Sequence, residues 1–549
     1  MPDKEKLYIR YRKDSTSIDR NEVKKLDRPF TLLGKLASLL FMVLCVFAIW
    51  RFTLRADEWY LLGGLMFVYL LIKQVCALWY RPSKRELTKD YKVSVIITCF
   101  NENPTSVVQI FENILALDYP VHEILFLDDG SKDTLAFDVA KSFAKDHLVE
   151  APNFQLVRFG VNRGKRAVLS DGLYMAEGDY VFLVDSDSEI LPNALTELLR
   201  PFEDGKTTSS VGNIGILNKE ENFLTKLQSI TYFGSFQLGR AAQSVTGDVV
   251  VCSGAFSLHK KDFILENLDE LHEDNMFGIT VSAGDDRAIT TFSKKSGGKT
   301  RYQSTAYCET LAPDKWKKFL SQRRRWTRSG YIGSLKSIKD MFPRQLWYLF
   351  WAFAETYFWL IATVSFIISV LNRGFHFHLM DVILYHCIIS FKHNGFYMLY
   401  KPTRFLLAPI YTFIYGFTLI YTRIYAVVTL YDDGWGTRGQ GRESEDTDFV
   451  IAEHVIFVPG IGELPPAACV PRKDNIVRWL PMPDADVRRA VREIHFPLPR
   501  EPTRDDIKCP LPRAPTGKSG CRLRSFSPIL HKTKKDGGAI SHLNRNKSL

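Results

Sequence analysis

The sequence predicts an α/β fold in which a doubly wound parallel sheet carries helices on both faces. Two observations support this prediction. Between residues 91 and 184, β-branched apolar runs alternate with helical stretches, which is the order of elements in a parallel sheet. Two of these runs end in acidic pairs, Asp128 with Asp129 and Asp185 with Asp187, and doubly wound sheets bind their ligands at this carboxyl edge.

Four strands are expected in this part of the sheet. Short runs rich in Val, Ile, Leu and Phe predict them at residues 92–98, 122–127, 154–158 and 180–184. Helical stretches are expected around residues 105–117, after the first strand, and from residue 162 to residue 176, after the third. Both acidic pairs therefore lie at the carboxyl ends of predicted strands.

The stretch 180–187 has two interpretations. An apolar run that must be buried ends in Asp185 and Asp187, one residue apart, and two carboxylates in this alternation cannot both be placed in a core. The pair either opens onto a crevice that holds a cation or caps the following turn.

Three further polar segments follow. Residues 246–257 are expected to form an apolar strand that breaks at a Cys-Ser-Gly sequence, where Gly254 permits a close approach of the backbone to a ligand. Residues 284–287 (Gly-Asp-Asp-Arg) open a helical stretch, and residues 322–326 (Gln-Arg-Arg-Arg-Trp) lie in a basic helix that begins near Pro313. This basic helix either lies on a membrane surface or is a solvated helix.

Composition limits the partners. The formal net charge of +11 and the pI of about 9.0 indicate anionic partners, such as membrane headgroups or a phosphorylated small molecule. The polar segments lack the interleaved basic and aromatic residues of a nucleic-acid groove, so we expect no nucleic-acid partner. The nine cysteines form no CxxC pair and no Cys/His cluster, which predicts reduced, cytosol-facing thiols rather than a zinc site or a disulfide framework.

Apolar segments precede the α/β region. Residues 30–52 and 59–80 each approach the ~20 residues that a helix needs to cross a bilayer. Lys and Arg flank residues 30–80 on both sides, so we expect a transmembrane hairpin with both ends in the cytosol; the alternative is a buried hairpin of a soluble protein. Lys73, inside the second span, is expected to face another helix or a water-filled path. Residues 1–29 are highly charged and read as a cytosolic tail.

Apolar segments return in residues 341–431, after a polar region at 91–340. Residues 346–371 and 406–431 are long enough to span a bilayer. Residues 381–400 contain Lys392, His393 and Asn394, which favours an interfacial or re-entrant segment. After residues 432–438, the stretch 439–549 is rich in Pro, Lys and Arg, and we expect it to be mostly disordered with a short ordered piece around 450–458.

The donor side of a transfer reaction fits the first set of polar residues. Residues 91–340 contain no P-loop, GxGxxG or HExxH motif. A metal held by Asp187 and Asp185 would bridge a nucleotide diphosphate and neutralise the leaving group. Asp128 is placed to accept hydrogen bonds from a nucleoside, and Lys165 and Arg325 are placed to meet the phosphates.

The acceptor side fits the second set. Asp286 is the candidate general base that takes the proton of the acceptor hydroxyl. Trp326 is the candidate for stacking on an acceptor sugar ring, and Arg287 either orients the carboxylates or touches the substrate. These residues together predict transfer from a nucleotide diphosphate to a hydroxyl group.

The order of the motifs resembles that of processive, membrane-embedded family 2 glycosyltransferases, over residues 91–438. The seven motifs are Asp128-Asp-Gly-Ser, Asn162-Arg-Gly-Lys-Arg, Asp185-Ser-Asp, Cys252-Ser-Gly, Gly284-Asp-Asp-Arg, Gln322-Arg-Arg-Arg-Trp and Trp435-Gly-Thr-Arg. Four segments are most similar to bacterial class I hyaluronan synthases, namely residues 240–244, 251–254, 282–287 and 302–306.

The resemblance implies a cytosolic GT-A-type glycosyltransferase domain, inserted between transmembrane helices of a multi-pass plasma-membrane protein. It implies alternating addition of glucuronic acid and N-acetylglucosamine from UDP-sugar donors, with Mg²⁺ or Mn²⁺, and export of the growing polysaccharide across the lipid bilayer through a channel of the same chain. Chitin and chitooligosaccharide synthases, which use UDP-N-acetylglucosamine alone, share these motifs. A membrane protein that binds a nucleotide-sugar or a glycan without catalysis is the third alternative, and the sequence predicts no oligomeric state.

The resemblance also implies a role for each site residue. Asp286 is the base, and Asp187 with Asp185 holds the metal. The UDP-binding residues are Asp128, Lys165, Arg325, Trp435 and Arg438, of which the last two belong to a gating loop at 432–438. The acceptor-binding residues are Cys252, Ser253, Gly254, Asp285, Gln322 and Trp326.

Overall fold

The structure is a computed structural model of the chain. It describes residues 7–11, 18–53, 60–147, 152–272, 275–276, 279–280, 284–358, 387–388, 390–429, 453–459, 462–464, 469–471 and 477–479. The chain divides into two units, Met1–Pro499 and Arg500–Leu549, and all described residues belong to the first.

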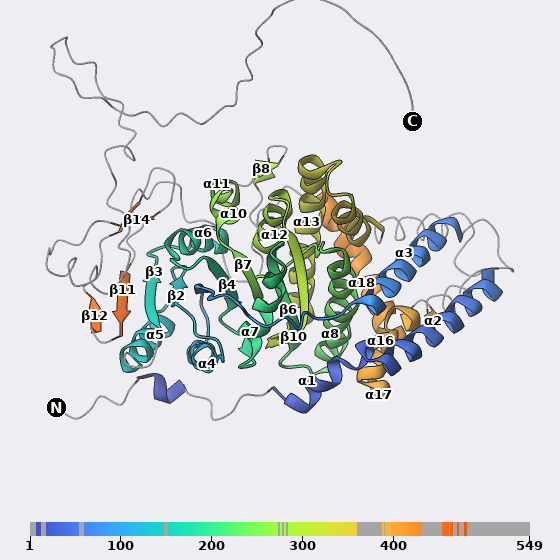
Figure 1. Cartoon of the computed structure of the whole chain (residues 1–549), viewed down its shortest axis with the longest axis horizontal. Helices are drawn as coiled ribbons and strands as arrows, with labels where there is room; N and C mark the ends of the chain where they lie inside the picture. The colour runs from blue at the N-terminus through green and yellow to red at the C-terminus, as the bar shows by residue number, and fades with distance from the viewer. Residues whose placement is uncertain are drawn as a thin grey trace, which may run out of the picture. The chain divides into compact units, whose positions relative to one another are not determined.

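A ten-stranded sheet forms the centre of this unit, in the order β12-β11-β3-β2-β1-β4-β7-β6-β10-β5 (Figure 1). Four neighbouring strands are parallel, and they confirm the four predicted runs: β1 (Val93–Cys99), β2 (Glu123–Asp128), β3 (Asn153–Arg158) and β4 (Tyr180–Asp185). Cys99 pairs with Asp128, and Thr98 pairs with Asp185. The two acidic motifs therefore lie at the same edge of the sheet.

Helices cover both faces of these strands, as the doubly wound prediction requires. One face packs against α4 (Pro104–Leu115), α5 (Leu135–Asp146) and α7 (Ala194–Leu199). The other packs against α6 (Lys165–Met175), α10 (Asp262–Leu265), α11 (Leu268–His272) and α12 (Asp285–Lys295). The alternation of side chains explains the division: Ile97 and Phe126 point to the first face, and Ile96 and Leu125 to the second.

The other half of the sheet is mixed, so the sheet is not parallel throughout. Strand β7 (Phe256–Lys260) is antiparallel to β4, and β6 (Thr207–Ile216) is antiparallel to β7. Strand β10 (Lys299–Thr310) is parallel to β6, and β5 (Glu189–Ile190) is antiparallel to β10.

The strand expected before the Cys-Ser-Gly sequence was wrong. Helix α9 ends at Thr246 (Ala241–Thr246), and the next strand, β7, begins at Phe256, after the motif. Val249 and Val250 are buried in the core, with exposures of 0% and 2%. Among the described residues, the only ladder contact near them is an isolated bridge between Asp248 and Thr300. The run of apolar residues in this segment reflects its burial, and such a run does not by itself distinguish a strand from another buried segment.

Helix η1 (Leu7–Tyr11) packs against α4 and α5, which cover the parallel half. The remaining helices are α1 (Arg20–Leu26), η2 (Arg28–Phe30), α2 (Leu32–Thr53), α3 (Tyr60–Trp79), η3 (Arg200–Asp204), α8 (Phe223–Phe233), the π-helix η4 (Gly234–Arg240), α13 (Trp316–Met341), α16 (Gly395–Tyr400), α17 (Pro402–Phe405) and α18 (Ala408–Val428). Residues 346–358 are also helical. Helix α13 packs against α18, and α3 packs against α9.

The apolar segments 30–52 and 59–80 are helical, as α2 and α3. Within the described residues, no single helix meets the length and hydropathy expected of a membrane span, and one bent pair, Arg20–Phe30 with Leu32–Phe47, meets them jointly across a bend of 59°. Lys73 faces another helix, as predicted: its Nζ lies 2.5 Å from Glu355 Oε1 in the helix 346–358.

A late segment of the chain returns to the edge of the sheet. Strand β11 (Glu453–Val458) pairs antiparallel with β3, and β12 (Gly462–Leu464) pairs with β11. An ordered piece was expected around 450–458, and β11 is that piece. Two short strand pairs complete the described elements: β8 (Asn275–Met276) with β9 (Ile279–Thr280), and β13 (Cys469–Pro471) with β14 (Val477–Trp479).

Candidate active site

Asp128 lies at the carboxyl end of β2 and is fully buried. Its Oδ1 accepts hydrogen bonds from Ser131 N at 3.0 Å and Ser131 Oγ at 2.5 Å, and its Oδ2 accepts one from Arg158 Nε at 3.2 Å. Burial raises the pKa of Asp128, and the bonds from Ser131 and Arg158 act in the opposite direction. These three hydrogen bonds hold the side chain in one position. The contact of Asp128 with a uridine stays a prediction.

The neighbouring Asp129 holds the loop that leads into α6. Its carboxylate accepts from the backbone nitrogens of Arg163, at 2.7 Å, and Gly164, at 2.9 Å, and from Asn162 Nδ2, at 3.1 Å. Burial raises the pKa of Asp129 to about 7, although these hydrogen bonds oppose the shift. Asp129 therefore fixes the start of α6, whose first residue is Lys165.

Lys165 joins this loop to the Asp-x-Asp pair. Its Nζ lies 2.7 Å from Asp185 Oδ1. Burial opposes the charge of the ammonium, but Asp185, Asp285 and Asp286 outweigh burial and raise the pKa of Lys165. The structure thus brings a predicted phosphate-binding cation against a predicted metal ligand.

Asp185 and Asp187 are both half-buried, while Ser186 between them is buried. Asp187 Oδ1 accepts a hydrogen bond from Thr310 Oγ1 at 3.2 Å, at the end of β10. Within the described part of the chain, no three His, Cys, Asp or Glu side chains form a metal cluster. Two carboxylates are nonetheless the set that Mg²⁺ takes from a protein when substrate phosphates supply further ligands, so these residues fit a divalent cation bound together with a diphosphate.

The Cys-Ser-Gly loop lies between this lysine and the acidic pair of α12. A Cβ placed on Gly254 would stand 3.6 Å from Asp285 Oδ2, 3.8 Å from Asp286 Cβ and 3.9 Å from Lys165 Nζ. Cys252 is fully buried, and its backbone nitrogen donates to Thr290 Oγ1 at 2.9 Å.

Burial raises the pKa of the Cys252 thiol to about 12, so this side chain is a neutral structural group. Ser253 fixes the turn, because its carbonyl accepts from Phe256 N at 3.0 Å. The predicted acceptor loop and the predicted base are thus close neighbours, with Lys165 near Gly254 as well.

Asp286 lies in the first turn of α12 and is half-buried. Burial raises its pKa, the charge of Asp285 raises it further, and Arg287 and Lys165 lower it. Its Oδ1 accepts from Arg287 N at 2.8 Å. The raised pKa is the property expected of a carboxylate that accepts a proton during catalysis.

Gly284 sets the junction of α12 with α13. Its φ is +89°, and a Cβ there would stand 1.9 Å from Ser329 Oγ, so this position takes only glycine. Ser329 lies one turn beyond Arg325 and Trp326, and Trp326 is 42% exposed. Gln322 Oε1 is buried without a hydrogen-bond partner among the described residues. The predicted gating residues Trp435 and Arg438 lie outside the described residues.

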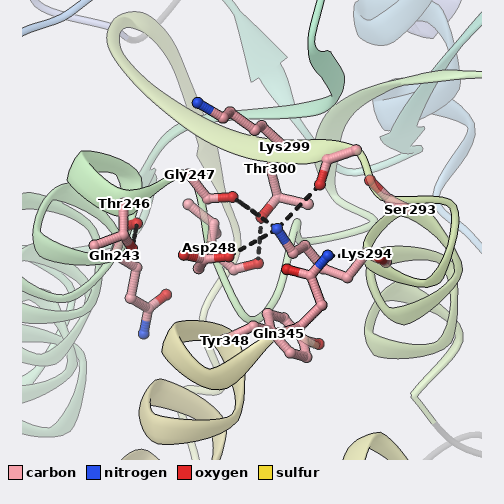
Figure 2. Close-up of polar contacts among 12 residues, drawn as sticks. Gln243, Thr246, Gly247, Asp248, Ser293, Lys294, Lys299, Thr300, Gln345 and Tyr348 are labelled. Atoms are coloured by element: carbon pink, nitrogen blue, oxygen red, sulfur yellow. Dashed lines mark hydrogen bonds and ion pairs between the residues drawn. The ribbon is translucent and has the colours of Figure 1, made fainter. Parts of the chain in front are cut away.

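A buried ion pair connects α12 to the segment that precedes the Cys252 loop (Figure 2). Lys294 Nζ, near the end of α12, lies 2.7 Å from Asp248 Oδ1, and both side chains are almost fully buried. The ammonium also donates to the carbonyls of Gly247, at 3.2 Å, and Gly298, at 3.0 Å. This pair ties α12 to the segment that leads into the Cys252 loop, and nothing in the local sequence marks either residue.

These contacts define a class of protein. A mixed α/β sheet whose parallel half gathers an Asp-x-Asp pair, a charged lysine and a helix-borne acidic pair at one edge is the arrangement of a GT-A-like glycosyltransferase fold.

Comparison with known proteins identifies the family. Residues 94–268 match the family described as Glycosyl transferase family 2. A hyaluronan synthase of Streptococcus pyogenes serotype M1 is 33% identical over 379 residues, covering 68% of this chain and 90% of that protein. The chain belongs to the processive family 2 glycosyltransferases, and its sequence is similar to hyaluronan synthases.

Two further relatives are more distant. An N-acetylglucosaminyltransferase of Azorhizobium caulinodans is 31% identical over 243 residues, covering 44% of this chain and 60% of that protein. A solved mannosyltransferase of Pyrobaculum calidifontis, in complex with GDP-Man and Mn²⁺, is 17% identical, with a TM-score of 0.47 over 72% of this chain and 99% of that one.

Proposed function

We propose that this chain polymerises UDP-glucuronic acid and UDP-N-acetylglucosamine into a hyaluronan-type polysaccharide and exports the product across a membrane. One structural observation carries the catalytic part of the proposal: Lys165, Asp285 and Asp286 all surround Gly254. This contact links the predicted donor site to the predicted acceptor site. The similarity to a hyaluronan synthase over 90% of that relative supports the choice of sugars.

On the donor side, Asp128 binds the uridine, and Lys165 and Arg325 bind the diphosphate. Asp187 and Asp185 would hold Mg²⁺ or Mn²⁺, and such an ion, when bound, neutralises charge on the departing UDP. The ion pair with Asp185 keeps Lys165 in place for the phosphates. Trp435 and Arg438, in the loop 432–438, are proposed to close over UDP.

On the acceptor side, Asp286 accepts the proton of the attacking hydroxyl. Burial and the like charge of Asp285 favour the protonated form, so the proton is taken up more readily than by a carboxylate in water. Trp326 stacks on the acceptor sugar, with Asp285, Gln322 and the loop Cys252, Ser253 and Gly254 around it. These groups hold the hydroxyl in line with the donor carbon.

The apolar helices are proposed to cross the plasma membrane and to provide the exit for the growing polysaccharide. The joint length of the bent pair Arg20–Phe30 with Leu32–Phe47 and the Lys and Arg residues on both sides of residues 30–80 support this arrangement. The ion pair of Lys73 with Glu355 supports it further, because a charge inside a bilayer requires a partner on another helix. The glycosyltransferase domain then faces the cytosol.

A second function has a specific observation in its favour. The N-acetylglucosaminyltransferase relative is 31% identical over 243 residues, so a chitin or chitooligosaccharide synthase that uses UDP-N-acetylglucosamine alone is the competing proposal. The two enzymes need the same base and the same metal pair. They differ in whether the product carries carboxylates.

The test is a donor-omission assay on membranes that contain the full chain. We expect polymer only when both UDP-sugars are present, and we expect a hyaluronan-specific lyase, but not a chitinase, to degrade it. Polymer formed from UDP-N-acetylglucosamine alone and degraded by chitinase would establish the competing function instead. A parallel arm with a chelator should stop UDP release, and turnover that persists in the chelator contradicts the metal assignment.

A further inference from the structure

Arg323 is a buried arginine in the middle of α13. Its residue exposure is 7%, and its Nε and Nη2 atoms are buried without a hydrogen-bond partner among the described residues. A guanidinium always carries its charge, and leaving its donors unpaired in a buried site is costly. Each unsatisfied buried group of this kind requires an explanation, and a bound ion or ligand that supplies the partner is one.

Aromatic rings surround this guanidinium. Its central carbon lies 5.1 Å from the ring centroid of Phe319, 4.5 Å from that of Trp326 and 5.2 Å from that of Tyr415. Cation–π contacts stabilise the charge through the faces of the guanidinium. They do not satisfy the N–H groups, which lie in its plane, and Nε and Nη2 keep the geometry that pairs with the two oxygens of an anion once the side chains that cover them move aside. We call Arg323 and these three rings the arginine cage.

The arginine cage lies close to the donor site. Thr310, whose hydroxyl binds Asp187, lies in the strand that leads directly into α13. Gln228 of α8 donates to Pro313 O at 2.8 Å, so α8 packs on the same connection. Burial raises the pKa of Tyr232, at the next turn of α8, to about 12, and the charges of Arg323, Asp187 and Asp185 all act on its hydroxyl. The hydroxyl of Tyr232 is therefore within electrostatic range of both the acidic pair and the cage.

The other wall of the cage belongs to the helix expected to cross the membrane. Tyr415 lies in α18, which packs along α13. Thr231 Oγ1 donates to Tyr411 Oη at 2.7 Å, which fixes α8 to α18. A sugar that leaves the transfer site toward the apolar helices would pass beside these rings.

We propose that Arg323 binds the carboxylate of a hexuronate residue of the growing glycan, while the rings of the arginine cage pack on the sugar. The inference rests on the proposed function, because only a glycan that contains glucuronate offers this group. A carboxylate fits a guanidinium fork better than a neutral sugar does, and Lys165 already lies against the Asp185 carboxylate on the diphosphate side. Arg323 would then contribute to selecting a glycan that contains uronate.

The test measures binding to the full-length protein in lipid nanodiscs. The probes are a tetrasaccharide of alternating glucuronate and N-acetylglucosamine, a tetrasaccharide of N-acetylglucosamine alone, and UDP. Arg323→Gln should weaken binding of the uronate tetrasaccharide by about tenfold, the size expected for a charge-assisted pair, and change the other two by less than about twofold. Arg323→Lys, which keeps the charge without the fork, should give an intermediate loss.

The adjacent arginine supplies a matched control. Arg324 contacts the ring of Tyr425 at 5.2 Å but lies outside the cage, so Arg324→Gln should leave all three affinities unchanged. Weaker binding of UDP to Arg323→Gln would show that the guanidinium serves the diphosphate, which overturns the proposal, as would unchanged binding of the uronate tetrasaccharide. If Arg323→Gln does not fold, the lysine variant decides between these outcomes.

Failure of the proposed function gives a different signature. A single-donor polymer in the donor-omission assay refutes the hyaluronan assignment without using any Arg323 variant. If the wild-type protein binds the uronate and neutral tetrasaccharides equally, the cage proposal fails even where both donors are required for polymer.

Discussion

The proposed general base, Asp286, gives a prediction at the scale of one residue. A base must be deprotonated to act, so activity should fall as the pH drops through the pKa of Asp286, which burial and Asp285 raise above the ordinary 3.8. Asp285→Asn removes the like charge, lowers the pKa of Asp286 and should move the acidic limb of the kcat/KM profile to lower pH. The measurement is UDP release as a function of pH at saturating metal.

Two variants control this experiment. Asp286→Asn lacks the base, and we expect it to lose about 10²–10⁴-fold in kcat while still binding UDP-sugars. Asp138→Asn changes an exposed carboxylate paired with Lys141 and should retain the wild-type profile. An acidic limb that stays in place or moves upward in Asp285→Asn argues against Asp286 as the titrating base.

Site residues that belong to a local sequence pattern could be predicted from the sequence. Residues whose role depends on burial and on distant partners could not. The pairs Asp185 with Asp187 and Asp285 with Asp286 are visible because they follow a strand or open a helix. Lys294 looks like an ordinary basic residue of an amphipathic helix, and Arg323 lies in the motif at residues 322–326 without a predicted role of its own; only the tertiary structure shows that both are buried. Their partners come from segments distant in the chain, such as Asp248 and Tyr415.

At the scale of elements, the buried pair of Lys294 and Asp248 sets the position of α12. Lys294→Met leaves the Asp248 carboxylate buried without its cation, which should lower the free energy of unfolding by about 3–5 kcal/mol. Adding Asp248→Leu removes the stranded charge and should restore much of this loss. Chemical denaturation followed by tryptophan fluorescence measures both effects.

The next residue provides the control for this prediction. Lys295 pairs with Glu270 at 3.1 Å, and its side chain is 42% exposed, so Lys295→Met should cost no more than about 1 kcal/mol. Equal losses in Lys294→Met and Lys295→Met would show that the buried pair does not anchor the helix.

The strand predicted before Cys252 was wrong because the segment lacks strand partners. The strands β1 to β4 alternate with helices, so their local pattern and their pairing agree. The segment around Val249 and Val250 has a strand-like composition, but its neighbours in space leave it only the Asp248–Thr300 bridge. An apolar segment becomes a strand only where it has a strand to pair with, and its composition does not show whether it has one.

At the scale of the whole molecule, the parallel half of the sheet follows from the order of elements, and the mixed half does not. Strands β6, β7 and β10 are separated by helices and long connections, so several pairings satisfy the same sequence. The return of β11 to the edge beside β3 is a contact across most of the chain. Such long-range pairing is set by which edge remains open rather than by local sequence.

This last contact leads to a prediction about truncation. Strand β11 pairs Phe457 with Phe154 of β3, and Val455 and Phe457 are buried, with exposures of 4% and 1%. Ending the chain after residue 452 would uncover β3 and leave an open edge that promotes association. Ending it after residue 499 keeps every described element. We expect the shorter chain to unfold at a lower temperature and to scatter more light, and the longer one to behave as the full chain.

Point variants separate the loss of packing from the loss of the tail itself. Phe457→Ala should lower the free energy of unfolding by about 3–5 kcal/mol, as for other buried aromatic side chains. Ile456→Ala, in the same strand but half-buried, should cost clearly less. If the chain that ends at 452 melts with the full-length protein, or if both point variants are neutral, β11 is dispensable, and the stability of the sheet then depends on the strands from β3 to β5 alone.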